Sequence, residues 1–206
     1  MKKKLLVFGH SGNLGSNFIH FLKNEYKFIL NINNSKLYFP DVYYIKIDKK
    51  NFLDNNQNLK KKIEEISPDI ILNAAACVNL DLCEKKPNET VFVNVILPSK
   101  LADICSKLRI KFVHISTDHL YNKTKSFKNE NYLTSKVNNY GFQKIKAENL
   151  ITKKNSNALI IRTNFFSHSS NSNQLIYKIK NVIESKKKIK LFDDYFFTPI
   201  YSKYLC

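Results

Sequence analysis

Apolar and polar residues follow two different patterns along the chain. The residues before Gly9 form a short continuous apolar run, which predicts a strand over 4–8. The apolar residues that follow recur at helical spacing and predict one face of a helix: Leu14, Phe18, Phe21 and Leu22. The same patterns predict further strands at 27–32, 42–47, 69–72, 110–115 and 158–161. They predict further helices at 59–66, 89–107, 139–153 and 173–185.

Prolines and polar stretches mark where these elements end. Ser67-Pro68 ends the helix predicted at 59–66, and Pro98 predicts a kink or a restart inside the helix predicted at 89–107. Residues 121–139 are polar and irregular and are predicted as a long loop. Strands that alternate with helices are typical of a parallel sheet covered on both faces, so the pattern predicts an α/β fold.

The charge of the chain admits two interpretations. The formal net charge is +17, which is typical of proteins that bind nucleic acid or an acidic membrane surface. However, the lysines are spread along the whole chain, and Arg109 and Arg162 are the only arginines. Lysine, asparagine and isoleucine are abundant together, which indicates a compositional bias with solvated lysines. We therefore expect neither nucleic acid nor a membrane as a partner.

The cysteines and the amino terminus bear on the cellular compartment. The cysteines have irregular spacing without a C-x-x-C pair, so reduced thiols are expected rather than disulfides or a zinc site: Cys77, Cys83, Cys105 and Cys206. The three lysines at 2–4 are followed by only a short apolar run, which does not fit a signal peptide. No apolar run reaches the roughly 18 residues of a membrane span. The sequence thus predicts a cytoplasmic protein of one domain, or one domain plus a fragment of another.

Three of the four glycines lie close together near the amino terminus. Gly9, Gly12 and Gly15 have the spacing G-x-x-G-x-x-G, after a predicted strand and at the start of a predicted helix. In this context glycines permit a tight turn and the approach of a pyrophosphate to the helix N-terminus. The alternative is an ordinary glycine-rich turn. We favour a phosphate-binding loop.

The residues after the second predicted strand bear on the choice of dinucleotide. An acidic residue in this region binds the ribose 2′-hydroxyl in many NAD-selective proteins. Residues 30–36 contain no carboxylate, and they end in Lys36. NADPH is therefore favoured over NADH, and both remain open.

A second constellation carries acid–base chemistry. Tyr140 and Lys144 have Y-x-x-x-K spacing, which places them on one face of a predicted helix. A lysine ammonium there can stabilise a tyrosinate and lower the pKa of the phenol. Ser116, Thr117 and Asp118 follow the strand at 110–115, so the Thr117 hydroxyl can meet a substrate oxygen beside Tyr140. A polar strand end or a helix cap is the alternative for this Ser-Thr-Asp stretch.

Together these motifs resemble the extended short-chain dehydrogenase/reductase family, in particular its dTDP-4-dehydrorhamnose reductase branch. The matching stretches are GHSGNLG (9–15), PDIILNAAACVNLDLCE (68–84), VNVILPSKLADIC (93–105), VHISTDHLYN (113–122), NNYGFQKIKAE (138–148) and IIRTNFF (160–166). The resemblance implies a Rossmann-type doubly wound parallel sheet. It also implies a dinucleotide-binding domain at 1–165 and a truncated, partial substrate-binding lobe at 166–206.

The resemblance also implies roles for individual residues. The catalytic set would be Thr117, Tyr140 and Lys144. The cofactor-binding residues would be Gly9, Gly12, Asn13, Leu14, Gly15, Asp48, Lys49, Ala74, Ala75, Val78, Tyr140 and Lys144. The substrate-binding residues would be Thr117, Asp118 and Phe165. His119 replaces a family tyrosine, Lys136 replaces a family proline, and no metal site can be located.

The activity implied is hydride transfer from NADPH or NADH to the C4 carbonyl of a dTDP-sugar. The acceptor would be dTDP-4-dehydro-6-deoxy-L-mannose, the product dTDP-L-rhamnose, and Tyr140 would protonate the developing alkoxide. A homodimer or a partner chain is the expected way to complete the lobe. A nucleotide-sugar epimerase or dehydratase is a related alternative, against which the stretch 73–84 speaks.

Two alternatives belong to other functional classes. The chain could be a non-catalytic module, as in the regulatory subunit of methionine adenosyltransferase that resembles this branch, or a truncated remnant that binds the cofactor only. Nucleic-acid binding through the +17 charge is the other alternative, and binding that survives moderate salt would support it.

Overall fold

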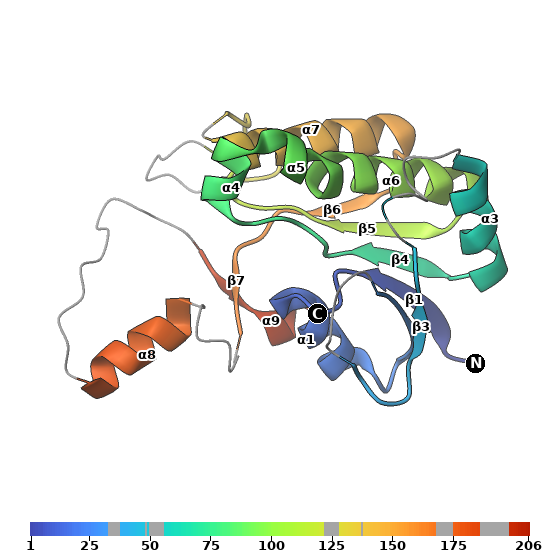
Figure 1. Cartoon of the computed structure of the whole chain (residues 1–206), viewed down its shortest axis with the longest axis horizontal. Helices are drawn as coiled ribbons and strands as arrows, with labels where there is room; N and C mark the ends of the chain where they lie inside the picture. The colour runs from blue at the N-terminus through green and yellow to red at the C-terminus, as the bar shows by residue number, and fades with distance from the viewer. Residues whose placement is uncertain are drawn as a thin grey trace.

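The structure is a computed structural model that describes residues 1–32, 38–47, 49, 56–121, 128–136, 138–167, 175–185 and 198–206. Its centre is a six-stranded parallel sheet in the order β3-β2-β1-β4-β5-β6 (Figure 1). The strands are β1 Lys3–Phe8, β2 Tyr26–Asn31, β3 Tyr43–Ile45, β4 Ile70–Asn73, β5 Lys111–Ile115 and β6 Leu159–Ile161. The strand order reverses between β1 and β4, so the predicted doubly wound Rossmann-type fold is confirmed.

Helices cover both faces of this sheet. The helices are α1 Asn13–Leu22, α3 Asn56–Ile66, α4 Leu80–Lys85, α5 Pro87–Val91, α6 Leu97–Leu108, α7 Asn139–Lys154, α8 Leu175–Ser185 and α9 Ser202–Leu205, of which α8 lies apart from the sheet. The helices α3, α6 and α7 pack on one face, and α1 and α9 pack on the other (Figure 1). No helix in the described ranges is both long and apolar enough to cross a membrane.

Strand β1 shows why its apolar run is continuous. Leu5 and Val7 pack with α1, whereas Leu6 and Phe8 pack with α3 and α6 on the opposite face. Successive side chains of a strand point to opposite faces, so a strand covered on both sides needs apolar residues at every position. Each fully buried side chain of this kind contributes about 1.5–3 kcal/mol.

The long helix predicted at 89–107 is divided in the structure. The helix α5 continues into a π-helical segment, η1 Phe92–Ile96, and α6 then begins at Leu97. Pro98 lies in the first turn of α6, where its missing N–H is tolerated, so the predicted restart is confirmed. The wide π-turn carries the buried Asn94, whose hydrogen bonds reach the loop after β4 and helix α7.

Short elements near the carboxyl terminus were not predicted. Strand β7 Phe165–Phe166 pairs in parallel with β8 Ile200–Tyr201. The helix α9 packs against α1, and the Ser202 hydroxyl donates to Asn17 Oδ1 over 3.0 Å. The division into a domain at 1–165 and a lobe at 166–206 stays a prediction.

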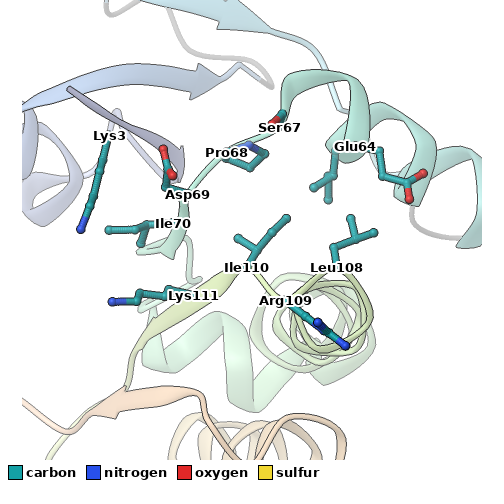
Figure 2. A pocket seen from close by; sticks show the side chains of 11 residues that line it. Lys3, Glu64, Ser67, Pro68, Asp69, Ile70, Leu108, Arg109, Ile110 and Lys111 are labelled. Atoms are coloured by element: carbon teal, nitrogen blue, oxygen red, sulfur yellow. The ribbon is translucent and has the colours of Figure 1, made fainter. Parts of the chain in front are cut away.

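A cavity of about 440 Å³ lies at the amino-terminal ends of β1, β4 and β5 (Figure 2). Ser67 and Arg109, which line it, follow α3 and α6 and have positive φ angles of 50° and 56°. Glycine is the common residue at such helix ends. This cavity is at the opposite edge of the sheet from the glycine loop. Ligands of doubly wound folds bind at the carboxyl ends of the strands, so the cavity is not the expected cofactor site.

Candidate active site

The glycine loop joins β1 to α1 at the carboxyl edge of the sheet. Gly9 has a φ angle of 85°, and a Cβ atom there would lie 2.5 Å from the Ala75 backbone nitrogen. A Cβ atom at Gly15 would lie 2.1 Å from the Gly9 carbonyl oxygen. At Gly12 the nearest atom to an added Cβ is the Gly9 oxygen, at 3.3 Å. Gly9 and Gly15 are thus needed for the packing of the chain itself, whereas Gly12 faces more open space.

The start of α1 suits an anion. Gly12 is its N-cap residue, no described side chain accepts a hydrogen bond there, and the first turn carries no acidic residue. The free N–H groups and the helix dipole favour a negatively charged ligand such as a pyrophosphate. The open space at Gly12 lies at this same helix start.

His10 supplies a second observation at this edge. Its Nδ1 donates to the carbonyl of Asn31, the last residue of β2, over 3.1 Å. Among the described residues, His10 Nε2 is a buried side-chain atom without a hydrogen-bond partner. An unsatisfied buried polar atom costs about 1–3 kcal/mol. The end of β2 is where the ribose of a dinucleotide lies in Rossmann-type folds, so this nitrogen and the glycine loop fit such a cofactor.

The structure brings some of the predicted cofactor residues together. Ala74 and Ala75 follow β4 and lie directly against Gly9. The Leu14 side chain is buried in the core, which leaves its backbone to meet a diphosphate. Asn13 Oδ1 accepts a hydrogen bond from the Ser167 hydroxyl over 2.5 Å.

The remaining predicted cofactor residues lie further out or cannot be placed. The Val78 side chain is 68% exposed. The Lys49 amine lies 5.2 Å from the ring centroid of Phe92. Asp48 and Lys36 lie outside the described residues.

The three predicted catalytic residues are all buried where β5 ends and α7 begins. Thr117 is 5% exposed, Tyr140 7% and Lys144 1%. Gly141 permits this arrangement, because a Cβ atom there would lie 2.9 Å from the His119 carbonyl oxygen. The fourth glycine of the chain therefore brings α7 close to the loop that carries Thr117. The ring of Tyr140 also meets the His119 ring edge-on, at 6.0 Å between centroids.

The phenol of Tyr140 keeps its proton in this structure. Burial raises the pKa of Tyr140 to about 12, and the Thr117 side chain opposes this rise. The expectation that Lys144 lowers the pKa of this phenol is wrong for the ligand-free chain. Lys144 Nζ instead contacts the Ile115 carbonyl oxygen at 2.8 Å and His114 Nε2 at 3.0 Å. Burial lowers the pKa of Lys144 to about 8.

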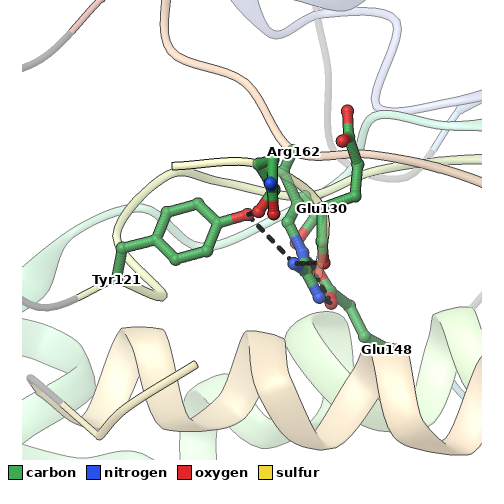
Figure 3. A network of polar contacts seen from close by, with 6 residues as sticks. Tyr121, Glu130, Glu148 and Arg162 are labelled. Atoms are coloured by element: carbon green, nitrogen blue, oxygen red, sulfur yellow. Dashed lines mark hydrogen bonds and ion pairs between the residues drawn. The ribbon is translucent and has the colours of Figure 1, made fainter. Parts of the chain in front are cut away.

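A network of polar contacts centred on Arg162 joins α7 to the loop after β5 (Figure 3). The Ser116 hydroxyl donates to Glu148 Oε1 over 2.5 Å. Arg162 Nε and Nη2 donate to Glu148 Oε2 over 3.0 and 2.7 Å. Arg162 Nη1 also donates to the Tyr121 hydroxyl and to the Glu130 carbonyl, each over 3.0 Å. Arg162 therefore joins α7, the end of β6 and two segments of the loop after β5.

A second network fixes the loop after β4. Asn94 Nδ2 donates to Gln143 Oε1 over 2.7 Å, and the Cys77 N–H donates to Asn94 Oδ1 over 2.8 Å. Gln143 Nε2 donates in turn to Thr90 Oγ1 over 2.9 Å. The π-turn thereby ties α7 to the segment that follows Ala74 and Ala75.

The predicted substrate residues are in two different settings. Asp118 is partly exposed, and its Oδ2 accepts a hydrogen bond from Asn164 over 3.2 Å. Phe165 is half-buried in β7 and packs against the cluster that includes α1. Their roles toward a sugar stay predictions.

Several polar residues of the site were not predicted. Only the fold reveals their buried contacts. Hydrogen-bond contacts are made by Asn73, His114, Glu148 and Arg162, whereas Nε2 of His10 has no partner among the described residues. One signal was available in the sequence. Tyr140, Lys144 and Glu148 lie four residues apart and share one helix face, which indicates a polar stripe that faces inward.

Known proteins match this chain over its whole length. The model of the RmlD substrate binding domain family matches residues 2–206. A probable low-salt glycan biosynthesis reductase of Haloferax volcanii is 25% identical over 198 residues, which cover 94% of this chain and 65% of that protein. The chain thus spans about two thirds of the length of this relative.

Solved structures agree with these matches. The crystal structure of a hypothetical dTDP-4-dehydrorhamnose reductase from Sulfolobus tokodaii is 25% identical, with a TM-score of 0.83 over 100% of this chain and 69% of that one. The dTDP-4-dehydrorhamnose reductase of Bacillus anthracis, solved in complex with NADP, is 23% identical, with a TM-score of 0.79 over 100% of this chain and 68% of that one. The fold, the order of the motifs and the family match lead to one conclusion: the chain belongs to the RmlD substrate binding domain family, in the dTDP-4-dehydrorhamnose reductase branch of the extended short-chain dehydrogenase/reductases.

Proposed function

We propose that this chain is the cofactor-binding and catalytic part of a reductase that uses NADPH or NADH to reduce the 4-keto group of a dTDP-sugar. The observation that carries the proposal is the buried Tyr140 beside Thr117, at the same edge of the sheet as the glycine loop. The named activities of the Haloferax volcanii relative and of the solved reductases support this class of reaction.

The glycine loop would hold the pyrophosphate of the dinucleotide. Its free helix N–H groups bind the phosphates, and Gly12 gives them room to approach. His10 Nε2 would face the ribose end. When bound, the reduced nicotinamide supplies a hydride to the sugar carbonyl.

Tyr140 would act as the general acid. Its raised pKa keeps the phenol protonated at neutral pH, so a proton is available for the oxygen at C4 as it becomes an alkoxide. The neighbouring Thr117 hydroxyl favours the tyrosinate that remains, and thus eases the transfer. Lys144 would hold the nicotinamide ribose from the same helix face.

The substrate is proposed as dTDP-4-dehydro-6-deoxy-L-mannose and the product as dTDP-L-rhamnose, a precursor of surface polysaccharide. Thr117, Asp118 and Phe165 would contact the sugar. We propose that the reaction takes place in the cytoplasm and that a homodimer or a partner chain completes the lobe at 166–206.

The test is NADPH oxidation by the purified chain with this sugar nucleotide, beside a Tyr140→Phe control. We expect turnover that the control reduces by about 10²–10⁴-fold, the contribution of a positioned general acid. NADPH binding measured by nicotinamide fluorescence should be retained in both proteins. Binding without turnover in the wild type would contradict the proposal and favour a non-catalytic module.

A further inference from the structure

A chain of buried polar side chains leads from Lys144 back to the loop after β4. Asn73, His114 and Lys144 are each at most 1% exposed, and they come from β4, β5 and α7. Lys144 Nζ lies 3.0 Å from His114 Nε2, and His114 Nδ1 lies 3.0 Å from Asn73 Nδ2. The register of the sheet explains the second contact, because Asn73 and His114 are paired in the two strands. Nothing in the proposed reaction uses these contacts.

Backbone groups fix the direction of the hydrogen bonds. The Ala75 N–H donates to Asn73 Oδ1 over 3.3 Å, so the amide nitrogen of Asn73 faces His114. An amide NH₂ group can only donate, so His114 Nδ1 must accept. A neutral imidazole then carries its proton on Nε2. Burial, together with the neighbouring Lys144, holds the pKa of His114 well below its usual value and so keeps the ring neutral.

This assignment determines the charge of Lys144. The Nε2–H group of His114 points at Lys144 Nζ, which must accept with a lone pair that only the neutral amine has. Lys144 Nζ in turn donates to the Ile115 carbonyl oxygen. An ammonium in this place would meet the imidazole donor to donor.

The surrounding ionisable groups do not reverse this conclusion. Tyr140 and Glu148 lie on the same helix as Lys144, and Glu148 favours the charged form of the lysine. Arg162 holds Glu148 in an ion pair at 2.7 Å, which reduces that influence. Burial is the larger effect on Lys144. Electrostatic interactions with Cys83, Asp118 and Cys77 raise the pKa of Tyr140.

We propose that Asn73 and His114 are positioning residues that stabilise the neutral amine of Lys144 in the ligand-free protein and couple its protonation to the Ala75 backbone. One incoming proton binds to His114 Nδ1, and the Nε2 proton passes to Lys144 Nζ. Asn73 then turns its amide so that Oδ1 accepts from Nδ1–H, and the Ala75 N–H is released beside Gly9. The role of Lys144 in catalysis rests on the proposed function, whereas this coupling belongs to the ligand-free chain.

The experiment is an NMR titration of the full chain without cofactor or substrate. Lysine ¹³Cε resonances report the charge of each lysine, and Lys144→Met assigns the resonance of interest. We expect one lysine resonance to titrate near pH 8, because burial lowers the pKa of Lys144 from the ordinary 10.5 to about 8. Two-bond ¹H–¹⁵N correlations should show His114 protonated on Nε2 above this midpoint and on Nδ1 below it.

Two variants sharpen the titration. His114→Gln offers an amide oxygen to a Lys144 ammonium, so the midpoint should rise by about one pKa unit, the effect of one hydrogen bond to a charged group. His114→Phe offers no acceptor, so its midpoint should not rise. Three results would each overturn the proposal: a Lys144 that titrates near the ordinary value of 10.5, an unchanged midpoint in His114→Gln, or an imidazole that keeps its Nε2 proton throughout. Turnover is not measured, so a chain without reductase activity leaves this result interpretable.

Discussion

The two halves of the candidate site, on either side of the point where the strand order reverses, are formed by different parts of the chain. On the side of β1 and α1, the site consists of backbone, with Gly9, Gly12 and Gly15 shaping a loop before a helix start. On the side of β5 and α7, it consists of buried polar side chains that hold one another in networks. The first side depends on the absence of atoms, and the second depends on satisfied hydrogen bonds. They should therefore fail differently when mutated.

Substitution of the glycines should have the largest effect and should separate two roles within one loop. In Gly15→Ala, the added Cβ would meet the Gly9 carbonyl at 2.1 Å, where backbone rather than a flexible side chain must move. We expect a loss of about 3 kcal/mol or more in the free energy of unfolding, at the upper end of overpacking effects. Denaturant unfolding followed by circular dichroism measures this loss.

Gly12→Ala is the matched control for that change. Its φ angle of −73° suits any residue, and its nearest contact is 3.3 Å, so stability should change by less than about 1 kcal/mol. Binding of NADPH should nevertheless weaken, because the methyl group occupies the approach to the helix start. Equal losses of stability in the two variants would contradict the separation of roles.

The buried Lys144 gives the second side a distinctive dependence on pH. Its folded pKa of about 8 lies below the unfolded value of 10.5. The unfolded chain therefore binds the proton more tightly, and this contribution to stability is complete above pH 10.5 and is lost as the pH falls through 8. The gain between these values should be roughly 3 kcal/mol.

Urea unfolding of wild type and Lys144→Met from pH 7 to 10.5 measures this gain as a difference between the two curves. Lys146→Met, which removes an exposed lysine of the same helix, is the control and should follow the wild type. Parallel curves for wild type and Lys144→Met would show that Lys144 titrates normally.

Loss of the ion pair between Glu148 and Arg162 should have an intermediate effect on stability. Glu148→Gln leaves Arg162 without its carboxylate, and we expect a loss of roughly 2–3 kcal/mol, moderated because the Arg162 side chain is 23% exposed. Glu184→Gln removes a partner of Lys180 in an exposed pair and should cost less than about 1 kcal/mol. Thermal unfolding of both variants gives the comparison. A Glu148→Gln protein as stable as Glu184→Gln would show that the buried ion pair contributes no more to stability than the exposed one.

Thr117→Val should have the smallest effect. The substitution preserves the volume of the side chain but removes the hydroxyl that opposes the rise in the pKa of Tyr140 and that accepts a hydrogen bond from the His119 N–H over 3.2 Å. Turnover should fall by roughly two- to tenfold, the value of one hydrogen bond. Thr163→Val, whose hydroxyl donates to the Asn164 carbonyl, is the control and should keep its turnover. A loss as large as that of Tyr140→Phe would show that Thr117 has a larger role than this hydrogen bond.

The same comparison explains what the sequence could predict. The glycine spacing, the strand that precedes it and the helix that follows are local features, and they were sufficient to predict the first side. Tyr140 and Lys144 were found for the same reason, because four residues separate them on one helix. The pair Asn73 and His114 becomes visible only through the pairing of β4 with β5.

The wrong expectation has the same origin. Helical spacing placed Lys144 on the face of Tyr140, but it could not reveal that His114 and the Ile115 carbonyl already bind the amine. The elements β7, β8 and α9 were missed because two- and four-residue segments carry too little periodicity. They form through contacts with distant parts of the chain, such as that between Ser202 and Asn17.

The central claim is that the two sides meet in one reaction, with a dinucleotide on the glycine loop and a proton donor at Tyr140. The most direct measurement uses NADPH labelled with deuterium at the transferable position, together with dTDP-4-dehydro-6-deoxy-L-mannose. We predict a product with deuterium at C4 of the sugar, seen by NMR, and little product from Tyr140→Phe. A wild-type chain that binds the labelled cofactor and leaves C4 without deuterium would contradict the account.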